Sequence, residues 1–379
     1  MKIGSWTSYL LVATMCFGPL SCSANPDDVT VQGSGATFPA PIYKRWFLEY
    51  YRKHPEVRVN YTPIGSGAGI RQFSNGLVVF GASDAGMSAK EMESLKEEFG
   101  PNGAPPAGRV KLLPLTAGSI VLSYNLPGVT EPITLSRDAY LGIFLGEITE
   151  WNDAQIDKDN PNVKLPGTAI RVVTRADSSG TTDVFTNHLY AIGGGKKEKG
   201  EEVVKGHWPA TMVGKAPKWK DGMIAGQGND GVAALIQMTP GGIGYLELGY
   251  AKLAKLSIAY LKNKSGKPVA ASEETGLAAL ENGLAALEKA RKPLPPDLQL
   301  KNYDPEGDDS YPIVTYTWVL CRAHYMKDKA HDAKAFKSVL AYCVSDEAQE
   351  IAGQLDYIPL PKKVRAAVLK AIDEITIDE

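Results

Sequence analysis

Short apolar stretches and stretches with helical spacing follow one another along most of the chain. Residues 57–61 alternate apolar and polar side chains, which is typical of a half-buried strand. Further short apolar runs, typical of buried strands, occupy residues 77–81, 112–115, 120–124 and 170–174. Helical spacing of apolar residues is found at residues 138–145, 181–192 and 231–238. This alternation predicts an α/β chain with parallel sheets.

Local signals mark two further helices. Residues 88–91 form a Ser-x-x-Glu capping box, which predicts a helix that runs to about residue 99. Residues 276–282 recur almost unchanged as residues 283–289. The leucines of this repeat form one stripe, consisting of Leu277, Leu280, Leu284 and Leu287. Since two copies are too few for a solenoid or a coiled coil, the repeat predicts one amphipathic helix packed on its own domain.

Length and composition are those of an ordinary globular protein. The 379 residues are 44% hydrophobic and 22% charged, which suits two or three domains with buried cores. The formal net charge of −2 comes from 41 basic and 43 acidic residues. Because proteins that bind nucleic acids usually carry a basic face, we expect no nucleic-acid partner.

The first residues have the pattern of an export signal. Lys2 precedes an apolar stretch that Pro19 interrupts and that is too short to span a bilayer. Leu20-Ser21-Cys22 then resembles the lipobox of bacterial lipoproteins, although Pro19 stands where that motif prefers leucine. In this interpretation residues 1–21 are removed, and Cys22 becomes the lipidated first residue of an anchored protein. The alternative is cleavage after Ala24 without a lipid. Both predict a location in the periplasm or at the outer face of the cell envelope.

Two cysteines, Cys321 and Cys343, remain in the predicted mature chain. Disulfides persist outside the cytoplasm, but the sequence does not show whether these thiols are close enough to form one, so a bridge stays open. Cys321-x-x-His324 has the form of half a metal site. Because no second pair of ligands follows at a suitable spacing, we expect neither a metal nor catalysis there, and we expect no cofactor.

Three short polar loops carry the candidate chemistry. Residues 33–41, 64–70 and 175–182 each follow a predicted strand and lead into a predicted helix. Each loop combines hydroxyl side chains with glycines that let the backbone approach a ligand closely, and the third also contains Arg175. The N–H groups and aligned peptide dipoles at a helix N-terminus favour an anion. One such loop is more often only a helix cap, but three in one α/β chain indicate an anion site.

Asp84 indicates which anion the site takes. It follows the predicted strand at residues 77–81, and α/β proteins bind ligands at this edge of the sheet. An ionised carboxylate only accepts hydrogen bonds, so it favours an anion that still carries a proton. Phosphate is protonated at neutral pH and sulfate is not, so we expect Asp84 to select phosphate over sulfate. Arsenate is protonated in the same way as phosphate, and Asp84 alone does not separate the two.

The same motifs resemble those of a known family, the substrate-binding protein of the bacterial phosphate-specific ABC importer. The run Gly-Ala-Thr-Phe-Pro-Ala-Pro at residues 35–41 is one of them. Similar runs follow in order at residues 64–69, 80–85, 175–181, 228–231, 242–245 and 355–357. The resemblance covers about residues 29–370. The chain departs from the family in a longer loop at residues 193–208, in the leucine repeat and in its two mature cysteines, none of which is a ligand position.

The resemblance implies a two-lobed periplasmic-binding-protein clamshell of type II, with the ligand in the cleft between the lobes. Lobe one would comprise residues 29–115 and 313–379, and lobe two residues 116–312. Asp177 would orient Arg175 and moderate its charge. The implied phosphate ligands are Ala36, Thr37, Phe38, Ser66, Asp84, Arg175, Ser179, Gly180 and Thr181.

The resemblance also implies a function and partners. A protein of this family binds inorganic phosphate with high affinity outside the cytoplasm. It delivers the phosphate to the membrane permease subunits of an ABC importer, which cytoplasmic ATPase subunits drive. We therefore expect a monomer that is a carrier and not an enzyme.

Other classes of function use similar loops. A phosphatase or phosphoryl transferase would need catalytic motifs, and the sequence contains no His-Glu-x-x-His, Gly-x-Ser-x-Gly or Gly-Lys-Ser/Thr run. The five histidines lie outside the loops, and we expect them at the surface. A binding protein for molybdate, sulfate or a phosphonate stays open, as does a surface adhesin or phosphate sensor without a transport role.

Overall fold

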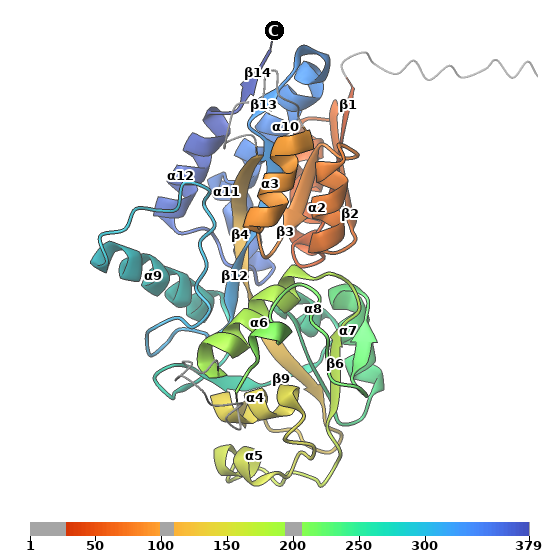
Figure 1. The fold of residues 1–379 in the computed structure, drawn as a ribbon, viewed down its shortest axis with the longest axis vertical. Helices are drawn as coiled ribbons and strands as arrows, with labels where there is room; N and C mark the ends of the chain where they lie inside the picture. The colour runs from red at the N-terminus through yellow and green to blue at the C-terminus, as the bar shows by residue number, and fades with distance from the viewer. Residues whose placement is uncertain (1–27, 99–109, 194–206, 379) are drawn as a thin grey trace, which may run out of the picture.

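Two lobes follow one another along the long axis of the molecule in the computed structural model, which describes residues 28–98, 110–193 and 207–378 (Figure 1). The upper lobe in this view contains the N-terminal strands and the C-terminal helices, and the lower lobe contains the middle of the chain. Strand β4 (Val110–Asn125) extends over 16 residues from one lobe into the other. Strand β12 (Val314–Arg322) lies antiparallel beside its first half. These two strands therefore connect the lobes.

The upper lobe, called lobe one below, draws its elements from both ends of the chain. Those from the N-terminal part are β1 (Val29–Gly35), α1 (Ala40–Lys53), β2 (Val57–Pro63), α2 (Ser66–Ser74), β3 (Phe80–Ser83) and α3 (Ala89–Glu98). Those from the C-terminal part are β13 (His324–Tyr325), η2 (Lys327–Lys329), α10 (Ala330–Cys343), α11 (Asp346–Gln354), α12 (Lys362–Asp373) and β14 (Thr376–Ile377). Strand β1 is parallel to β2 and β3, whereas β12 is antiparallel to β3 and β4.

The lower lobe, called lobe two, continues the same sheet from the second half of β4. Its helices are α4 (Arg137–Leu145), α5 (Ala154–Asp159), α6 (Gly180–Gly193), η1 (Ala210–Met212), α7 (Gly228–Met238) and α8 (Leu248–Leu253). Its strands are β5 (Thr134–Leu135), β6 (Arg171–Arg175), β7 (Ile224–Gly226), β8 (Gly242–Glu247), β9 (Ser257–Ile258), β10 (Tyr260–Lys262) and β11 (Pro268–Val269). The path across both lobes is β2-β1-β3-β12-β4-β8-β6-β7, with β9 pairing to β4.

Amphipathic helices cover the sheet in both lobes. Helix α1 buries one face, which consists of Ile42, Tyr43, Trp46, Phe47 and Tyr50. Trp46 Nε1 donates a 2.6 Å hydrogen bond to the carbonyl of Ala348, which ties α1 to α11. In lobe two, Tyr245 of β8 stacks on Phe185 of α6 with ring centroids 4.5 Å apart. This packing fixes where the strands end, and the three polar loops begin at those ends.

The predicted α/β pattern is confirmed, with corrections to the strands. Strand β3 begins at Phe80 and not at Leu77, whose side chain is 68% exposed. The apolar runs at 112–115 and 120–124 belong to the single strand β4, because the small residues between them are buried where the strand crosses between the lobes. The sheet is mixed and not parallel, since the crossing strands run antiparallel to their neighbours.

The leucine repeat forms one helix, α9 (Glu273–Lys289), as predicted, but the expectation that it packs only on its own domain is wrong, because it also contacts the C-terminal part of the chain. It begins with a capping box between Ser272 and Thr275 and lies beside β12 (Figure 1). A Cβ atom at Gly276 would lie 2.3 Å from Cδ1 of Ile358, so α9 also approaches the C-terminal part of the chain closely. The helix thus sits next to the strands that connect the lobes.

Cys321 and Cys343 carry free, buried thiols, and the bridge that the sequence left open is not formed. Burial raises the pKa of Cys321 to about 12, which keeps this thiol protonated and unreactive at neutral pH. The predicted signal, Cys22 and most of the 193–208 loop lie outside the described residues. Among the helices that the structure describes, none combines the length and apolar character that crossing a membrane requires.

Candidate anion-binding site

The three polar loops meet where the two lobes face each other. The loop after β1 and the start of α2 belong to lobe one, and the loop between β6 and α6 belongs to lobe two. The backbones approach so closely that a Cβ atom at Gly180 would lie 2.5 Å from Ser66 Oγ and 2.8 Å from the backbone nitrogen of Asp84. The Gly67 N–H also donates to the carbonyl of Ser178 at 2.9 Å. The glycines of these loops therefore permit contact between the lobes.

Arg175, the last residue of β6, is held by Asp177. Its Nε and Nη2 atoms donate to Oδ1 and Oδ2 of Asp177 at 2.8 and 2.6 Å, which is a bidentate pair, and the Arg175 side chain is only 1% exposed. Burial raises the pKa of Asp177, but the hydrogen bonds and charge of Arg175 and the Gly228 N–H lower it more, so Asp177 stays ionised. The remaining guanidinium N–H groups reach Thr37 Oγ1 at 3.3 Å and Thr181 Oγ1 at 3.4 Å. The guanidinium is thus fixed and directed at both lobes.

Asp84 follows β3 and is buried, with 1% of its surface exposed. Its Oδ1 atom accepts a 3.0 Å hydrogen bond from Thr317, and its Oδ2 atom accepts a 3.3 Å bond from Thr181. Burial raises the pKa of Asp84 to about 7, against the opposing effects of the Thr317 hydrogen bond and the Arg175 charge. The carboxyl group can therefore change its protonation state near neutral pH.

Ser66 and Ser179 lie at the two helix N-termini of the site. Ser66 Oγ accepts hydrogen bonds from the N–H groups of Gly180, at 3.1 Å, and Asp84, at 3.3 Å, so it joins α2 to α6 across the cleft. Ser179 Oγ accepts a 3.1 Å bond from the Thr182 N–H and so caps α6. Both hydroxyls still have a proton to donate.

The first loop is anchored from both lobes. Thr37 Oγ1 accepts a 2.8 Å hydrogen bond from the side-chain amide of Asn229, and the Thr37 carbonyl accepts one of 2.7 Å from Tyr250. The Phe38 carbonyl accepts a 2.7 Å bond from Tyr357. The Ala36 N–H donates to the carbonyl of Ala82 at 3.0 Å, so the sheet uses this donor.

The structure brings the predicted site residues together, and it adds three that the sequence did not single out as site residues: Asn229, Tyr250 and Thr317. Asn229 belongs to the run at residues 228–231, and that motif was the available signal for it. Thr317 was detectable only as one of two threonines in a mostly apolar strand. The role of the predicted residues as phosphate ligands stays a prediction.

One expectation about histidine is wrong. His188 is fully buried and not at the surface: its ring nitrogens contact the hydroxyl of Tyr140 at 2.8 Å and the carbonyl of Tyr303 at 2.6 Å. Burial lowers its pKa to about 4. Helical spacing places it on the inner face of α6, which the sequence reading did not consider. Among the described residues, no group of His, Cys, Asp and Glu side chains has the arrangement of a metal site.

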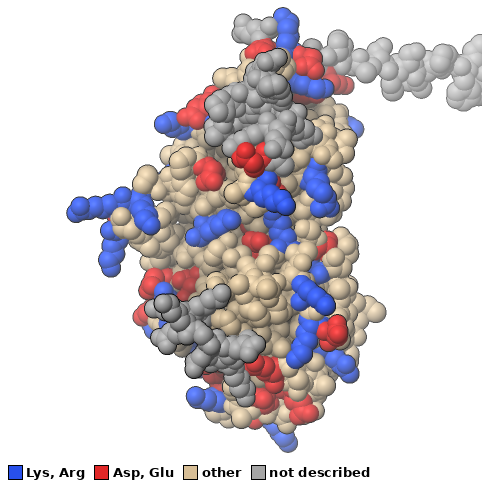
Figure 2. Space-filling model, viewed as in Figure 1, with Lys and Arg blue, Asp and Glu red and all other residues tan. Residues whose placement is uncertain are grey.

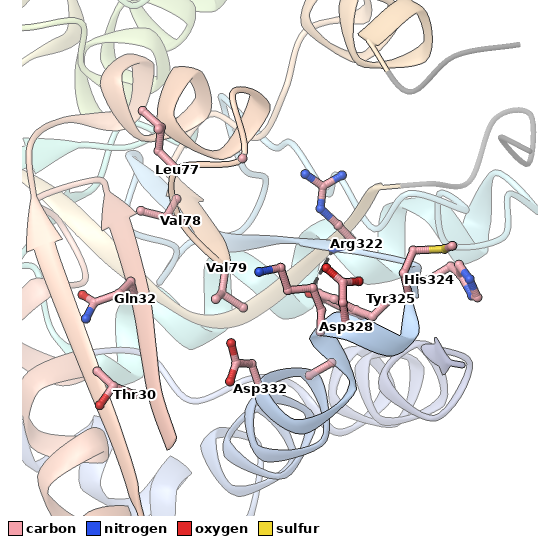
Figure 3. A pocket seen from close by; sticks show the side chains of 14 residues that line it. Thr30, Gln32, Leu77, Val78, Val79, Arg322, His324, Tyr325, Asp328 and Asp332 are labelled. Carbon is pink, nitrogen blue, oxygen red and sulfur yellow. Dashed lines mark hydrogen bonds between the residues drawn. The ribbon is translucent and has the colours of Figure 1, made fainter. Parts of the chain in front are cut away.

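A separate hollow of about 580 Å³ lies at the other end of the lobe-one sheet (Figure 3). Thr30 and Gln32 from the first half of β1 line it, together with Arg322 at the end of β12. The candidate site instead follows the last residues of β1 and lies near the start of β12. The hollow is therefore distinct from the site.

The arrangement is that of a two-lobed binding protein with its ligand site in the cleft. Comparison with known proteins leads to the same class. A PBP superfamily domain, the periplasmic-binding-protein class, matches residues 22–347. The phosphate-binding protein PstS of Methanocaldococcus jannaschii is 34% identical over 94% of this chain and 88% of its own length. That of Pasteurella multocida is 36% identical over 88% of this chain and 87% of its own length. The chain therefore belongs to the PstS family of phosphate-binding proteins.

Solved structures confirm the fold. The phosphate-binding protein from Stenotrophomonas maltophilia superposes with a TM-score of 0.68 at 22% identity, over 90% of this chain and 94% of its own. A high-affinity periplasmic phosphate-binding protein, solved with phosphate bound, gives a TM-score of 0.66 at 21% identity, over 90% and 93% of the two chains. At these identities the likeness concerns the fold, which is the predicted clamshell.

Proposed function

We propose that this protein binds inorganic phosphate in the cleft between its lobes, outside the cytoplasm, and delivers it to an ABC importer. The observation that carries this proposal is the convergence of hydrogen-bond donors from both lobes around one buried carboxyl group, Asp84. Relatives at 34% and 36% identity are named as phosphate-binding proteins, which supports phosphate as the ligand.

The donors suit the four oxygens of a phosphate. The N-termini of α2 and α6 meet in the site, and their aligned peptide dipoles favour an anion. Arg175 supplies the positive charge, and Asp177 keeps it in place. Ala36 belongs to the first loop, but its N–H donates to the carbonyl of Ala82 and is therefore not available to the ligand. The groups that we expect to donate are the Arg175 guanidinium, the hydroxyls of Thr37, Ser66 and Ser179, and the N–H group of Phe38. The Thr181 hydroxyl donates to Asp84 and the Gly180 N–H donates to Ser66, so in the arrangement seen here these two residues position their partners.

Asp84 discriminates between anions according to whether the anion carries a proton. An ionised Asp84 accepts a hydrogen bond from a P–O–H group and repels an anion that has no proton. Two of its lone pairs already accept from Thr317 and Thr181, so the carboxylate is held in one orientation toward the cleft. Leaving it opposite a sulfate oxygen costs about 1–3 kcal/mol or more, which corresponds to at least about a fivefold preference for phosphate.

Binding and release require the lobes to close and open. Strands β4 and β12 connect the lobes and are the expected hinge, with lobe one at residues 29–115 and 313–379 and lobe two at 116–312. Two ion pairs join lobe one to lobe two: Lys215 with Glu91 at 2.8 Å, and Lys252 with Asp356 at 2.6 Å. The closed form is the one that we expect to dock on the permease subunits.

We expect an extracytoplasmic monomer, anchored by a lipid at Cys22, that acts as a carrier without enzymatic activity. On the face drawn in Figure 2, Lys and Arg side chains are interspersed with Asp and Glu side chains over both lobes. This mixed surface supports the expectation of no nucleic-acid partner.

Calorimetric titration of the mature protein tests the proposal directly. We expect tight binding of one phosphate per chain, competition by arsenate and little competition by sulfate. Comparable binding of sulfate at pH 8 would remove the role given to Asp84. Turnover of a phosphomonoester that depends on Asp84 would favour an enzyme instead.

Single substitutions test the site assignment. We expect Arg175→Ala, Ser179→Ala and Thr37→Ala each to weaken phosphate binding, with Arg175→Ala the largest effect because it removes the buried positive charge. Ser265→Ala, in a turn of lobe two where the hydroxyl donates to Asn263, is the matched control. Binding like that of the unmodified protein in all three site variants would show that the phosphate lies elsewhere.

A further inference from the structure

A second cavity, of about 390 Å³, lies between α9 and β12, beside the candidate phosphate site. Leu284 and Leu287 of the leucine stripe form one wall, and Tyr316 and Trp318 of β12 form the opposite wall. Asp84 contributes to the inner end. Cavities of about 300–1,000 Å³ are the usual size of small-molecule sites. The leucine stripe, which the phosphate site does not use, thus lines a space large enough for an organic ligand.

Tyr316 provides an independent sign of a ligand. The residue is only 4% exposed, and its hydroxyl group has no hydrogen-bond partner among the described residues. Tyrosine hydroxyls normally find a partner when they are buried. Leaving a buried hydroxyl without one costs about 1–3 kcal/mol. The Tyr316 side chain lines the cavity, so a small rotation would bring its hydroxyl to an acceptor atom on a molecule bound there.

Charge around the cavity indicates how such a molecule lies. Lys292 and Lys301 are among the lining residues and are exposed to solvent, so they stand at the mouth. Asp84 belongs to the inner end, which therefore disfavours a negative group. Apolar side chains form most of the wall between them. A molecule with an apolar body inside and an anionic group at the mouth fits this distribution.

We propose that this cavity is a binding site for a small apolar organic anion, a carboxylate or sulfonate on an aromatic or aliphatic body. The body packs between the leucines of α9 and the aromatic side chains of β12. An acceptor atom takes the hydrogen bond of Tyr316, and the charged group pairs with Lys292 and Lys301.

The cavity also links this site to the phosphate site. Ala85 of lobe one and Val184 of α6 in lobe two both line it, so a bound molecule contacts both lobes in the closed form. A ligand that touches both lobes favours closure, and closure is also what phosphate favours. By linkage each ligand then raises the affinity of the other by the same factor. This coupling rests on the proposed phosphate function, whereas the site itself does not.

Fluorescence titration with 1-anilinonaphthalene-8-sulfonate, an apolar aromatic sulfonate, tests the site on the mature chain. We expect saturable binding of one probe per chain and tighter probe binding when phosphate is present. Leu284→Trp fills the cavity and is expected to abolish this binding. Leu253→Trp, at a leucine that is 82% exposed and outside the cavity, is the matched control and should leave it unchanged. Replacing Lys292 and Lys301 by Gln should lower the affinity for the probe about threefold or more.

The results of these experiments test three claims separately: that the cavity is a binding site, that it is coupled to phosphate binding, and that the protein binds phosphate. Probe binding that survives Leu284→Trp, or that does not saturate, overturns the site, and a normal circular-dichroism spectrum of the variant shows that it has folded. Leu284-dependent probe binding that phosphate does not change, in a protein shown by calorimetry to bind phosphate, overturns the coupling. If calorimetry finds no phosphate binding while the Leu284-dependent binding persists, the proposed function fails and the site stands.

Discussion

Oγ1 of Thr317 donates a 3.0 Å hydrogen bond to Oδ1 of Asp84, and 233 positions in the sequence separate the two residues. Thr315, two residues earlier on the same face of β12, donates to the main-chain carbonyl of Asp84 at 3.1 Å. One strand that connects the lobes therefore holds both the backbone and the carboxyl group of Asp84. Thr317 therefore positions the carboxyl group of Asp84, which we expect to discriminate between anions.

Thr317→Val should weaken phosphate binding by about tenfold, because it removes a hydrogen bond to a charged group while keeping the shape of the side chain. The measurement is calorimetric titration at pH 8, where Asp84 is mostly ionised. Thr315→Val removes only the bond to the backbone and is the matched control, for which we expect a smaller loss. An affinity in Thr317→Val equal to that of the unmodified protein would show that Asp84 needs no orientation.

Sulfate binding should strengthen as the pH falls. Burial raises the pKa of Asp84 to about 7, so the carboxyl group is mostly ionised at pH 8 and mostly protonated at pH 6. The protonated group can donate a hydrogen bond to a sulfate oxygen, which the ionised group repels. We expect sulfate affinity, measured directly by calorimetry, to rise about tenfold from pH 8 to pH 6, in step with the protonated fraction. In Asp84→Asn this rise should disappear, and a rise of equal size there would assign it to another group.

Asp84→Asn should stabilise the phosphate-free protein at pH 8 more than at pH 5. The pKa of Asp84 is raised from 3.8 to about 7 by folding, so between these values the folded state binds a proton that the unfolded state lacks. Stability is therefore lost as the pH rises toward 7, by about 2–3 kcal/mol between pH 5 and pH 8. Glu247 is also buried, and burial raises its pKa to about 8, so it adds a similar trend. Chemical denaturation of both proteins at both pH values isolates the part due to Asp84.

The sequence predicted the parts of the site that depend on local chemistry. Each loop follows a strand and opens a helix, and that order alone places its hydroxyls and N–H groups at a helix N-terminus, as the structure has them at Ser66 and Gly180. The capping box of Ser88 and Glu91 is likewise formed. Asp84 was found because it directly follows a buried strand.

Long-range relationships were not predictable in the same way. Thr317 enters the site only because β12 packs against a segment far away in the sequence, and no local pattern distinguishes it from other polar residues. Asn229 lies in the run at residues 228–231, but its contact with Thr37 depends on the packing of α7 against a distant segment. Strand β4 was predicted as two strands because its central residues, at 116–119, are either small or polar, although the structure buries them. His188 was placed at the surface since its partners, Tyr140 and the Tyr303 carbonyl, come from other elements.

Glu91→Gln should speed up phosphate release. Glu91 of α3 and Lys215 of lobe two form an ion pair across the cleft at 2.8 Å, with side-chain exposures of 29% and 15%. Because the pair is partly solvated, we expect its loss to raise the dissociation rate by only about two- to fivefold, and by less at high salt. Stopped-flow release measures this effect. Glu306→Gln, which breaks the exposed pair with Lys264 within lobe two, is the matched control. Equal rates in both variants would mean that the Glu91 pair does not secure closure.

Asp177→Asn should lower the thermal stability of the phosphate-free protein strongly and that of the phosphate-bound protein much less. Asp177 pairs with Arg175, whose side chain is only 1% exposed, and removing one partner of a buried ion pair typically costs about 3–5 kcal/mol. Bound phosphate would supply the missing negative charge next to the guanidinium. We therefore expect the phosphate-induced rise in melting temperature to be larger in Asp177→Asn than in the unmodified protein.

Asp153→Asn serves as the control for this experiment, because Asp153 caps α5 in lobe two by accepting from the Gln155 N–H, and Asn caps a helix equally well. Its melting temperature should follow that of the unmodified protein with and without phosphate. If Asp177→Asn instead lost the same stability in both conditions, the charge of Arg175 would not be what phosphate neutralises. The guanidinium would then serve the packing between the lobes, and the anion would have to be held by the hydroxyl and N–H groups of the loops alone.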